Sequence, residues 1–283
     1  MDKIFSNNIH EDFMTRAIEL AYNGLGNVSP NPLVGCIIVK DGVVIGEGYH
    51  KEFGCNHAEV EACINSTKSP EGATLYVTLE PCCIEGKTPP CTDFLIQNGI
   101  RSVYVGSLDP NPKVNGKGIA ILKSEGIEVI TGILEKECDE LNKGYNKWQY
   151  TKKPWVIAKL AESIDGFISK DSNSRTLITE DEALSHCHKL RSNVDAILVG
   201  RQTAIVDNPR LTVRKVKGCN PLRVILDTNR VLPLNLNVFT DREADTIVIC
   251  SSEKFTNNRV SHCEYLVCDE GSDGLLDASK VLE

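Results

Sequence analysis

The feature that most constrains this chain is an alternation of short apolar runs with amphipathic helical segments through its 283 residues. An amphipathic helix is expected at 10–23, and Asp41-Gly42 between two apolar runs predicts a β-hairpin. Further strands are expected at 73–79, 102–105 and 127–130, and further helices at 57–65, 92–98, 118–124 and 134–148. Alternation of this kind is typical of helices layered over a sheet, so we predict an α/β fold.

A second alternation begins after Lys152-Lys153-Pro154, where the proline stops a helix and the residue before it favours extended backbone. Strands are expected at 155–160, 195–199, 222–226, 246–250 and 264–268, and helices at 179–193 and 275–282. The segment from Thr179 to Glu182 fits a capping box. At roughly 150 residues per domain, we predict two domains, 1–150 and 151–283.

The net charge of −8 is concentrated in the first half of the chain. Residues 1–150 hold 13 Lys+Arg against 20 Asp+Glu, which gives −7, and the rest hold 18 against 19, which gives −1. An acidic first half disfavours nucleic acid as a partner, because phosphate backbones require basic surface. The first 13 residues lack an apolar leader and no run approaches the roughly 18 apolar residues of a membrane span. We therefore expect no membrane partner and a cytoplasmic location, where the 12 cysteines are thiols or metal ligands.

Two segments together match the chemistry of a catalytic zinc site. The first is His57-Ala58-Glu59, and the second places Cys82 and Cys91 each directly after a proline. One His and two Cys leave a fourth zinc position for water, whose pKa the metal lowers from about 15.7 to about 7. Glu59 would then transfer protons instead of binding metal. Side chains two apart in mid-helix diverge by about 200°, so His57 must stand at a helix entrance with Glu59 in the first turn.

The spacing also leaves alternatives for this site. Nucleobase deaminases carry the pattern H-x-E…P-C-x-x-C, whereas here eight residues separate Cys82 from Cys91. Cys55 and Cys83 are rival ligands, and Cys82 is favoured because it follows Glu and Pro as in the pattern. A structural zinc site would recruit a fourth protein ligand and has no use for a carboxylate beside its His. The catalytic interpretation is therefore preferred.

The first domain resembles, over its whole length, the deaminase domain of the bifunctional deaminase/reductase family of riboflavin biosynthesis. The segments that carry the resemblance are NPLVG (31–35), GEGYH (46–50), HAEV (57–60), TLEPC (78–82), GKTPPC (86–91), DPNP (109–112) and LNKG (141–144). The resemblance implies a cytidine-deaminase-like three-layer domain with one Zn²⁺, held by His57, Cys82 and Cys91. It also implies hydrolytic removal of an amino group with Glu59 as the catalytic residue.

The implied substrate is 2,5-diamino-6-ribosylamino-4(3H)-pyrimidinone 5′-phosphate, whose 2-amino group would be replaced by water with release of ammonia. The family pattern assigns the base, ribose and phosphate of this substrate to Asn31, His50, Lys87, Asp109 and Asn111. The chemistry agrees, since asparagine offers a donor and an acceptor to a pyrimidine edge and Lys87 offers charge for phosphate. Asn31 and Asn111 also flank prolines and could be turn residues.

The second half resembles the reductase domain of the same family, whose fold is like dihydrofolate reductase. The matching segments are KLAESIDG (159–166), LR (190–191), DAILVG (195–200), DNP (207–209), LTVR (211–214) and ILDT (225–228). By position, NADPH would contact Ala161, Leu177, Thr203, Asp207 and Thr228. The substrate would contact Lys159, Arg191, Leu211 and Arg214. Hydride transfer to the ribosyl C1 would give the ribityl side chain, and an Arg pair suits its phosphate because guanidinium presents a planar fork of donors.

Two departures from the family pattern concern this half. Leu177 stands where the family has Trp before an Ile-Thr pair, and Ser174 or Arg175 occupies the neighbouring substrate position. The family's domain also continues past residue 283 to a further strand and a Glu-Gly-Gly turn at a helix N-terminus, a natural cradle for cofactor phosphates. We therefore expect a partial dihydrofolate-reductase-like α/β domain with an open sheet edge and an exposed apolar face.

The resemblance favours a bifunctional enzyme that binds a phosphorylated pyrimidine and forms homo-oligomers. One alternative is a deaminase whose C-terminal half is a scaffold or dimerisation module, and another is a non-catalytic zinc-binding protein. Within the enzyme class, the rivals are deaminases of free cytidine, guanine or a nucleic acid. The acidic first half disfavours nucleic acid, and Lys87 and the attached second domain disfavour a free base.

Overall fold

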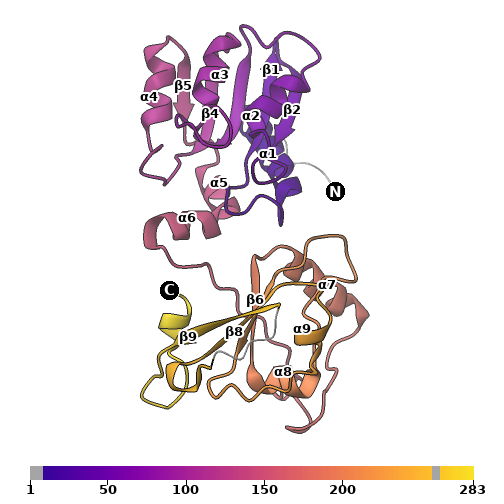
Figure 1. Cartoon of the computed structure of the whole chain (residues 1–283). Helices are drawn as coiled ribbons and strands as arrows, with labels where there is room; N and C mark the ends of the chain where they lie inside the picture. Colours follow the sequence, from indigo (N-terminus) through magenta and orange to yellow (C-terminus); the bar gives the residue numbers. More distant parts are fainter. Residues whose placement is uncertain (1–8, 257–261) are drawn as a thin grey trace. The chain divides into compact units, whose positions relative to one another are not determined.

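The structure is a computed structural model that describes residues 9–256 and 262–283. The chain divides into two compact units, Met1–Trp155 and Val156–Glu283, each with its own sheet (Figure 1). The expected absence of a leader concerns the first 13 residues, of which 1–8 lie outside the described ranges. Among the described helices, none combines the length and the apolar character that a membrane crossing requires.

The first unit is built on a five-stranded sheet in the order β2-β1-β3-β4-β5. Its strands are β1 (Gly35–Lys40), β2 (Val43–Tyr49), β3 (Thr74–Leu79), β4 (Ser102–Ser107) and β5 (Glu128–Thr131). Strand β1 runs antiparallel to β2 and β3, whereas β3, β4 and β5 are parallel. The predicted hairpin is confirmed: Asp41 and Gly42 join β1 to β2 with φ of 52° and 75°, the positive values of a two-residue hairpin turn.

Helices cover both faces of this sheet, which confirms the three-layer domain. One layer holds α1 (Ile9–Ala21), continued by the 3₁₀ turn Tyr22–Gly24, and α5 (Glu135–Leu141); the other holds α2 (Ala58–Ile64), α3 (Cys91–Gln97) and α4 (Lys117–Ser124). Strand β1 shows why both layers are needed, because its side chains alternate between the two faces. Cys36 and Ile38 belong to the core under α2, and Ile37 packs in the core that contains Met14 of α1.

Two glycines allow the close contacts that position the predicted ligand segments. A Cβ on Gly48 of β2 would lie 2.3 Å from the Ala62 amide nitrogen, so α2 rests directly on β2. A Cβ on Gly118 of α4 would lie 2.2 Å from the Pro81 carbonyl oxygen, so α4 rests on the loop after β3. Glycine is required where backbones approach this closely, and the start of α2 and the Pro81 loop are fixed as a result.

The single helix predicted at 134–148 is wrong, because two helices occupy this stretch. Helix α5 ends at Leu141 and α6 spans Lys143–Thr151, with Asn142 between them. The Asn142 side chain accepts from the Leu33 amide at 2.8 Å and donates to the Leu33 carbonyl at 2.8 Å. Asn142 is buried, and this two-way bond to a distant loop holds it out of helical conformation.

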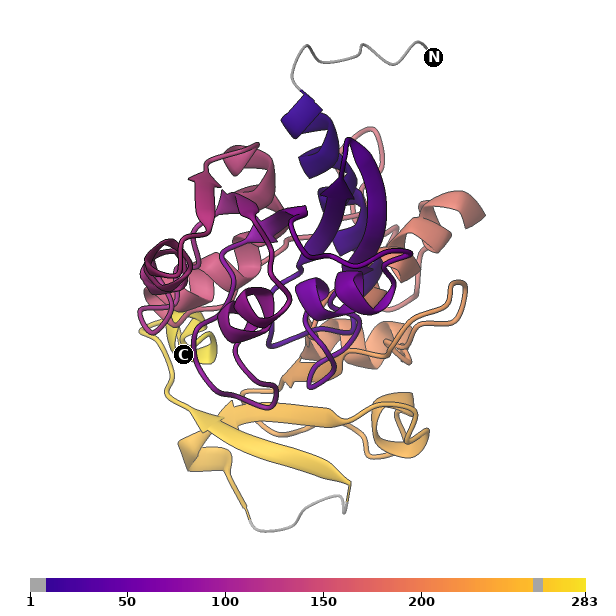
Figure 2. The ribbon, with the colours of Figure 1, turned by 90° about the horizontal axis from the view of Figure 1, so that it is seen from above.

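The second unit contains a parallel four-stranded sheet in the order β6-β7-β8-β9. Its strands are β6 (Ala196–Gly200), β7 (Leu222–Leu226), β8 (Thr246–Ser251) and β9 (Cys263–Cys268), and Figure 2 shows β8 and β9 side by side. The remaining elements are α7 (Asp181–Ser192), α8 (Arg201–Asp207), α9 (Asn237–Thr240), the 3₁₀ turn Ser252–Lys254 and α10 (Ala278–Val281). The core gathers Ile225, Val248 and Phe239, and the buried Arg223 bonds Asp241 beside it.

Three local predictions for this unit are wrong. Residues 155–160 form no strand and lie outside the sheet, with Val156 and Ile157 more than half exposed (54% and 55%). A strand needs a neighbour to bond its backbone, and residues 155–160 pair with none of the described strands. The capping box is also absent, since Glu180 is the N-cap and makes no side-chain cap bond, and the final helix covers only 278–281 of 275–282.

Candidate active site and metal centre

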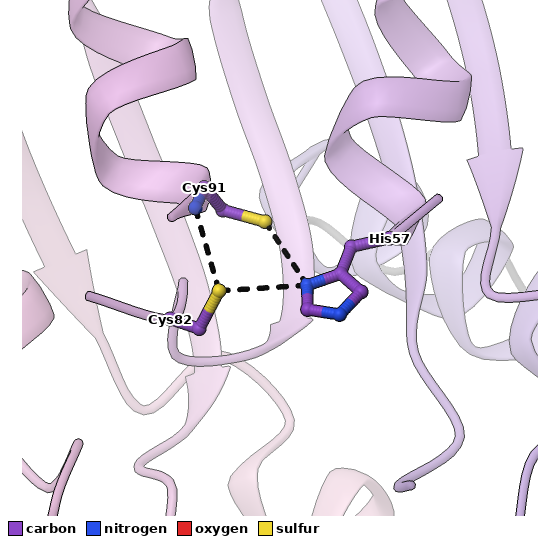
Figure 3. A group of neighbouring side chains, drawn as sticks. All are labelled: His57, Cys82 and Cys91. Carbon is purple, nitrogen blue, oxygen red and sulfur yellow. Dashed lines mark hydrogen bonds between the residues drawn. The ribbon is translucent and has the colours of Figure 1, made fainter. Parts of the chain in front are cut away.

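Three side chains from separate segments meet at one point of the first unit (Figure 3). His57 precedes α2, Cys82 follows β3, and Cys91 begins α3. His57 Nδ1 lies 3.2 Å from Cys91 Sγ and 3.4 Å from Cys82 Sγ, and the Cys91 amide donates to Cys82 Sγ at 3.3 Å. All three ligand atoms lie within 4.8 Å of one another, which is the spacing that a single bound cation requires.

Each part of this cluster suits zinc. Two sulfurs and one imidazole nitrogen form a donor set that zinc prefers, and three protein ligands are the number found in catalytic zinc sites. His57 Nε2, on the far side of the ring, lies 3.3 Å from Thr88 Oγ1. A hydrogen bond at the second ring nitrogen fixes the tautomer that presents Nδ1 to a metal. The residues present therefore fit a zinc ion.

One of the two thiols, Cys82, favours the deprotonated form that binds a metal. The pKa of Cys82 is lowered to about 4 by its hydrogen bond with the Cys91 side chain, and further by His57 and the Cys91 amide. The pKa of Cys91 is raised instead, first by its hydrogen bond to Cys82 and then by burial. The lowered pKa of Cys82 favours its thiolate, the form that binds zinc. The rival Cys83 directs its Sγ toward the Lys113 carbonyl at 3.9 Å, and among the described residues the metal cluster includes neither Cys83 nor Cys55.

Glu59 occupies the position that the spacing argument requires. His57 is the extended N-cap of α2 and Glu59 lies in the first turn, so both side chains face the same site. Glu59 is only 3% exposed, and its carboxylate is within reach of Cys91. Burial raises the pKa of Glu59 and His57 partly offsets this effect. A carboxyl with a raised pKa beside three metal-type donors is suited to proton transfer.

A pocket of about 210 Å³ opens beside this cluster. Its walls include Glu59, His57 and Cys82 together with the five residues predicted to hold the deaminase substrate: Asn31, His50, Lys87, Asp109 and Asn111. Apart from Glu59 of α2, these residues come from four loops that meet at the carboxyl ends of β3 and β4 and at the entrance of α2. The pocket thus combines amide, carboxylate and ammonium groups around the candidate metal.

His50 and Asn31 form one hydrogen-bonded pair in this wall. His50 Nδ1 lies 2.9 Å from the Asn56 carbonyl, so that nitrogen carries the proton and donates. His50 Nε2 then accepts from Asn31 Nδ2 at 3.0 Å. Burial lowers the pKa of His50, which keeps the ring neutral. The pair therefore fixes the orientation of the Asn31 amide and leaves its oxygen for a ligand.

The structure adds residues that the sequence did not single out. Glu80 is buried, and its carboxylate accepts from the amides of Asp109 (3.3 Å), Gly116 (2.9 Å) and Ile119 (3.3 Å). It therefore ties the Cys82 loop to the loop of Asp109. The position before Pro81-Cys82 was a signal for Glu80, whereas nothing local marked the two other additions, Phe53 and Tyr145, which also line the pocket.

A second pocket, of about 300 Å³, lies in the second unit. It gathers three of the four predicted reductase-substrate residues, Arg191, Leu211 and Arg214, together with Arg175 and His188. Arg191 and Arg214 both donate to the Thr212 carbonyl, at 2.7 and 3.3 Å, and this shared acceptor holds the two guanidinium groups side by side. Lys159 is exposed and does not line this pocket.

The residues predicted to contact NADPH are less tightly grouped. Thr203 and Asp207 lie on α8, directly after β6, and Thr228 follows β7. Strands β6 and β7 are parallel neighbours, so these residues follow the same carboxyl edge, where dinucleotides bind α/β sheets. Ala161 is half-buried and Leu177 is exposed, both outside helices and strands. The edge carrying Thr203 and Thr228 fits a dinucleotide.

Two family profiles match the chain. Residues 7–107 match the cytidine and deoxycytidylate deaminase zinc-binding region, and residues 154–283 match the RibD C-terminal domain. Together with the His-Cys-Cys cluster, these matches define a zinc-dependent deaminase joined to a reductase domain that uses NADPH.

Relatives that match over most of the chain narrow the assignment. The riboflavin biosynthesis protein RibD of Actinobacillus pleuropneumoniae is 42% identical over 261 residues, 91% of this chain and 69% of the relative. That of Aquifex aeolicus is 43% identical over 246 residues, 87% of this chain and 69% of the relative. The crystal structure of a diaminohydroxyphosphoribosylaminopyrimidine deaminase/5-amino-6-(5-phosphoribosylamino)uracil reductase from Thermotoga maritima matches with TM-score 0.84 and 40% identity, covering 94% of this chain and 82% of that one. The chain belongs to the RibD family and is a bifunctional enzyme of riboflavin biosynthesis.

Proposed function

We propose that residues 1–150 hydrolyse 2,5-diamino-6-ribosylamino-4(3H)-pyrimidinone 5′-phosphate at its 2-amino group. Water supplies the new carbonyl oxygen and ammonia leaves, giving 5-amino-6-ribosylaminouracil 5′-phosphate. Residues 151–283 would then reduce the ribosyl group to a ribityl chain with hydride from NADPH. The observation that carries this proposal is the cluster of His57, Cys82 and Cys91 beside Glu59, on the wall of a pocket lined by amide and charged groups.

In the deamination, Glu59 is the proton carrier. Zinc bound by His57, Cys82 and Cys91 would lower the pKa of water to about 7, so a nucleophile forms at neutral pH. Glu59 takes the proton that this water releases and delivers it to the ring nitrogen of the base. It then takes the second proton of the former water from the hydroxyl now bonded to the ring carbon and transfers it to the amino group; the C–N bond breaks, ammonia leaves and the carbonyl forms. The burial of Glu59 supports this role, because a raised pKa allows the carboxyl to hold a proton between the two transfers.

The other pocket residues would bind the substrate. Asn31, fixed by neutral His50, offers its amide oxygen to the pyrimidine edge. Asp109 would accept a hydrogen bond from a sugar hydroxyl, and Asn111 would donate one to the sugar. Lys87 lies at the pocket wall as the one ammonium group among its lining residues, and it would bind the 5′-phosphate.

In the reductase, Arg191 and Arg214 would bind the phosphate of the deaminated product, and Leu211 would pack against it. Ala161, Leu177, Thr203, Asp207 and Thr228 would contact NADPH. The paired guanidinium groups in the 300 Å³ pocket support this arrangement, because two planar donor forks suit one phosphate.

Two wider properties belong to the same proposal. We expect self-association through the second unit, since exposed apolar side chains in number commonly mark an interaction surface. These include Val156, Ile157, Leu160, Leu198 and Leu266. We also expect a cytoplasmic location, because all 12 cysteines are free thiols, as in a reducing compartment. Light scattering of the purified protein measures its oligomeric state, and cell fractionation measures its location.

The test supplies purified, zinc-loaded protein with the diaminopyrimidinone ribosyl phosphate, with and without NADPH. Ammonia release and NADPH absorbance are followed together. Glu59→Gln should abolish ammonia release, and Glu125→Gln, an exposed glutamate of the same unit, should leave it unchanged. The Glu59 variant should still oxidise NADPH when it is given the deaminated product.

The outcomes separate the alternatives. Ammonia release and NADPH oxidation together support the bifunctional proposal. Ammonia without NADPH oxidation, even from supplied product, would assign the second unit a scaffold role. Absence of ammonia from zinc-loaded protein would overturn the substrate assignment.

A further inference from the structure

The helix that leads into the second unit also forms part of the deaminase pocket. Helix α6 (Lys143–Thr151) ends just before the RibD C-terminal profile begins at residue 154, and it lies outside the deaminase profile at 7–107. Nevertheless Tyr145, on its first turn, lines the pocket of the zinc cluster. This wall of the pocket is therefore supplied by the last helix of the first unit, outside the deaminase profile.

Tyr145 makes a specific polar contact there. Its Oη donates to Asp109 Oδ1 at 2.9 Å. The Asn111 amide donates to the same oxygen at 2.8 Å. In the described part of the chain, both hydrogen bonds to the Asp109 carboxylate thus end on Oδ1, which leaves Oδ2 for another donor. The Tyr145 hydroxyl also interacts with the Asn111 side chain, so it lies between two residues that we assign to the substrate.

The start of the same helix is bonded to the loop that carries Asn31. Asn142, between α5 and α6, binds both the amide and the carbonyl of Leu33 at 2.8 Å. Leu33 follows the turn that presents Asn31 to the pocket. Because Asn142 is buried and doubly bonded, the helix start cannot shift without moving this turn. The position of Tyr145 relative to Asp109 is fixed as a result.

We propose that Tyr145 is a positioning residue for the deaminase: it holds the Asp109 carboxylate so that Oδ2 accepts a sugar hydroxyl of the substrate. This inference rests on the proposed function, since it concerns the same pocket and the same sugar phosphate. A carboxylate that is held through one oxygen can accept a hydrogen bond from a hydroxyl through the other oxygen. Because its orientation is already fixed, it loses little further rotational freedom when the substrate binds. Tyr145 therefore acts through Asp109 and contributes to binding and not to proton transfer.

The test compares Tyr145→Phe with Tyr150→Phe in the full-length, zinc-loaded protein. Tyr150 lies on the same helix and is 73% exposed, which makes it a matched control. Removing one hydrogen bond to a charged acceptor should raise the deaminase KM about three- to tenfold with kcat within about twofold of wild type. The affinity for the deaminated product, measured by calorimetry without turnover, should fall by the same factor. Zinc content should not change.

A double-mutant cycle with Asp109→Asn identifies the partner. If Tyr145 acts through Asp109, adding Tyr145→Phe to Asp109→Asn should change KM and product affinity little further. Equal falls in kcat and thermal stability with unchanged KM would show that Tyr145 is only a packing residue and overturn the proposal, as would additive effects in the cycle. A wild-type protein that releases no ammonia would instead contradict the proposed function, and product binding would still report on Tyr145.

Discussion

The two units of this chain differ in how completely their sheets are covered. In the first unit, helices pack on both faces of the sheet, and residues from 31 to 145 meet in one pocket. In the second unit, the edge strand β6 alternates exposed and half-buried side chains, with Leu198 46% exposed, and the 155–160 segment pairs with no described strand. The first unit has its pocket at the ends of a covered sheet, whereas in the second unit α7 and the segment after α8 line a pocket and the edge strand stays partly exposed.

This difference shows what assembles a site. The deaminase pocket depends on contacts far apart in sequence, such as Asn142 with Leu33 and Glu80 with Gly116, that hold loops in place. The reductase pocket also has bonds between distant residues, Arg191 with Thr212 and Arg214 with His188, but Arg214 is exposed. Long-range bonds between buried groups fix a geometry more firmly than bonds to exposed groups, because they cannot be broken without moving packed elements. The deaminase is therefore expected to withstand changes in the second unit.

The largest effect should follow from removing a zinc ligand. Cys82→Ser should lower ammonia release about a thousandfold or more, because the metal supplies the nucleophile at neutral pH. NADPH oxidation with supplied product should remain near wild type if the two sites are independent. Cys83→Ser is the control, since the adjacent thiol faces Lys113 and leaves the cluster intact. Zinc content measured by mass spectrometry should fall in the first variant alone. A zinc-replete, active Cys82→Ser protein would contradict the ligand assignment.

Zinc-site geometry and the fold of the first unit were largely predictable from the sequence, because the signals for them lie between residues close together in the chain. The H-x-E spacing predicts that His57 stands at a helix entrance with Glu59 in its first turn, and both positions are confirmed. Period-two and period-3.6 patterns likewise predict most strands and helices. Such signals lie within a few residues of one another, so the sequence carries them directly.

Contacts between distant residues were not predictable in the same way. Tyr145 and Asp109 are 36 residues apart, and neither position alone indicates the bond between them. The break at Asn142 escaped a helical pattern because its cause is a loop 109 residues away. The apolar run at 155–160 matches a strand in composition, but strand formation also requires a partner, which composition does not record.

The second largest effect tests whether the two units unfold independently. Arg223 is fully buried and donates to Asp241 at 2.7 Å, so Arg223→Met leaves an uncompensated buried carboxylate. Loss of one partner of a buried pair costs about 3–5 kcal/mol, and the unfolding transition of the second unit should move to lower temperature. The first unit's transition and ammonia release should stay unchanged. Lys280→Met, which breaks the exposed pair with Asp269, should move the transition far less, because water screens this pair. A single shifted transition for the whole chain would contradict independent units.

A smaller effect is expected from Glu80 in the first unit. Glu80→Gln replaces one carboxylate oxygen with an NH₂ group that faces backbone amides, so at least one of three accepted bonds is lost. Because these are bonds to a charged acceptor, we expect a loss of about 1.5–3 kcal/mol in unfolding free energy and a lower deaminase kcat/KM. Denaturant titration and ammonia release measure the two quantities. An unchanged stability would show that Glu80 does not hold the Cys82 and Asp109 loops together.

The smallest effect concerns the mouth of the deaminase pocket, where Lys87 Nζ lies 3.9 Å from the centre of the Phe53 ring. Both residues line the pocket, and the ring holds the ammonium group in place while leaving its charge available to phosphate. Phe53→Leu removes a cation–π contact at an exposed position, so the KM for the phosphorylated substrate should rise about two- to fivefold. Phe53→Tyr keeps the aromatic ring, so its KM should equal that of the wild type. The same measurement with the dephosphorylated nucleoside should show no difference between the variants, because Lys87 then has no phosphate to bind. An equal rise for both substrates would assign Phe53 to the base or sugar and separate it from Lys87.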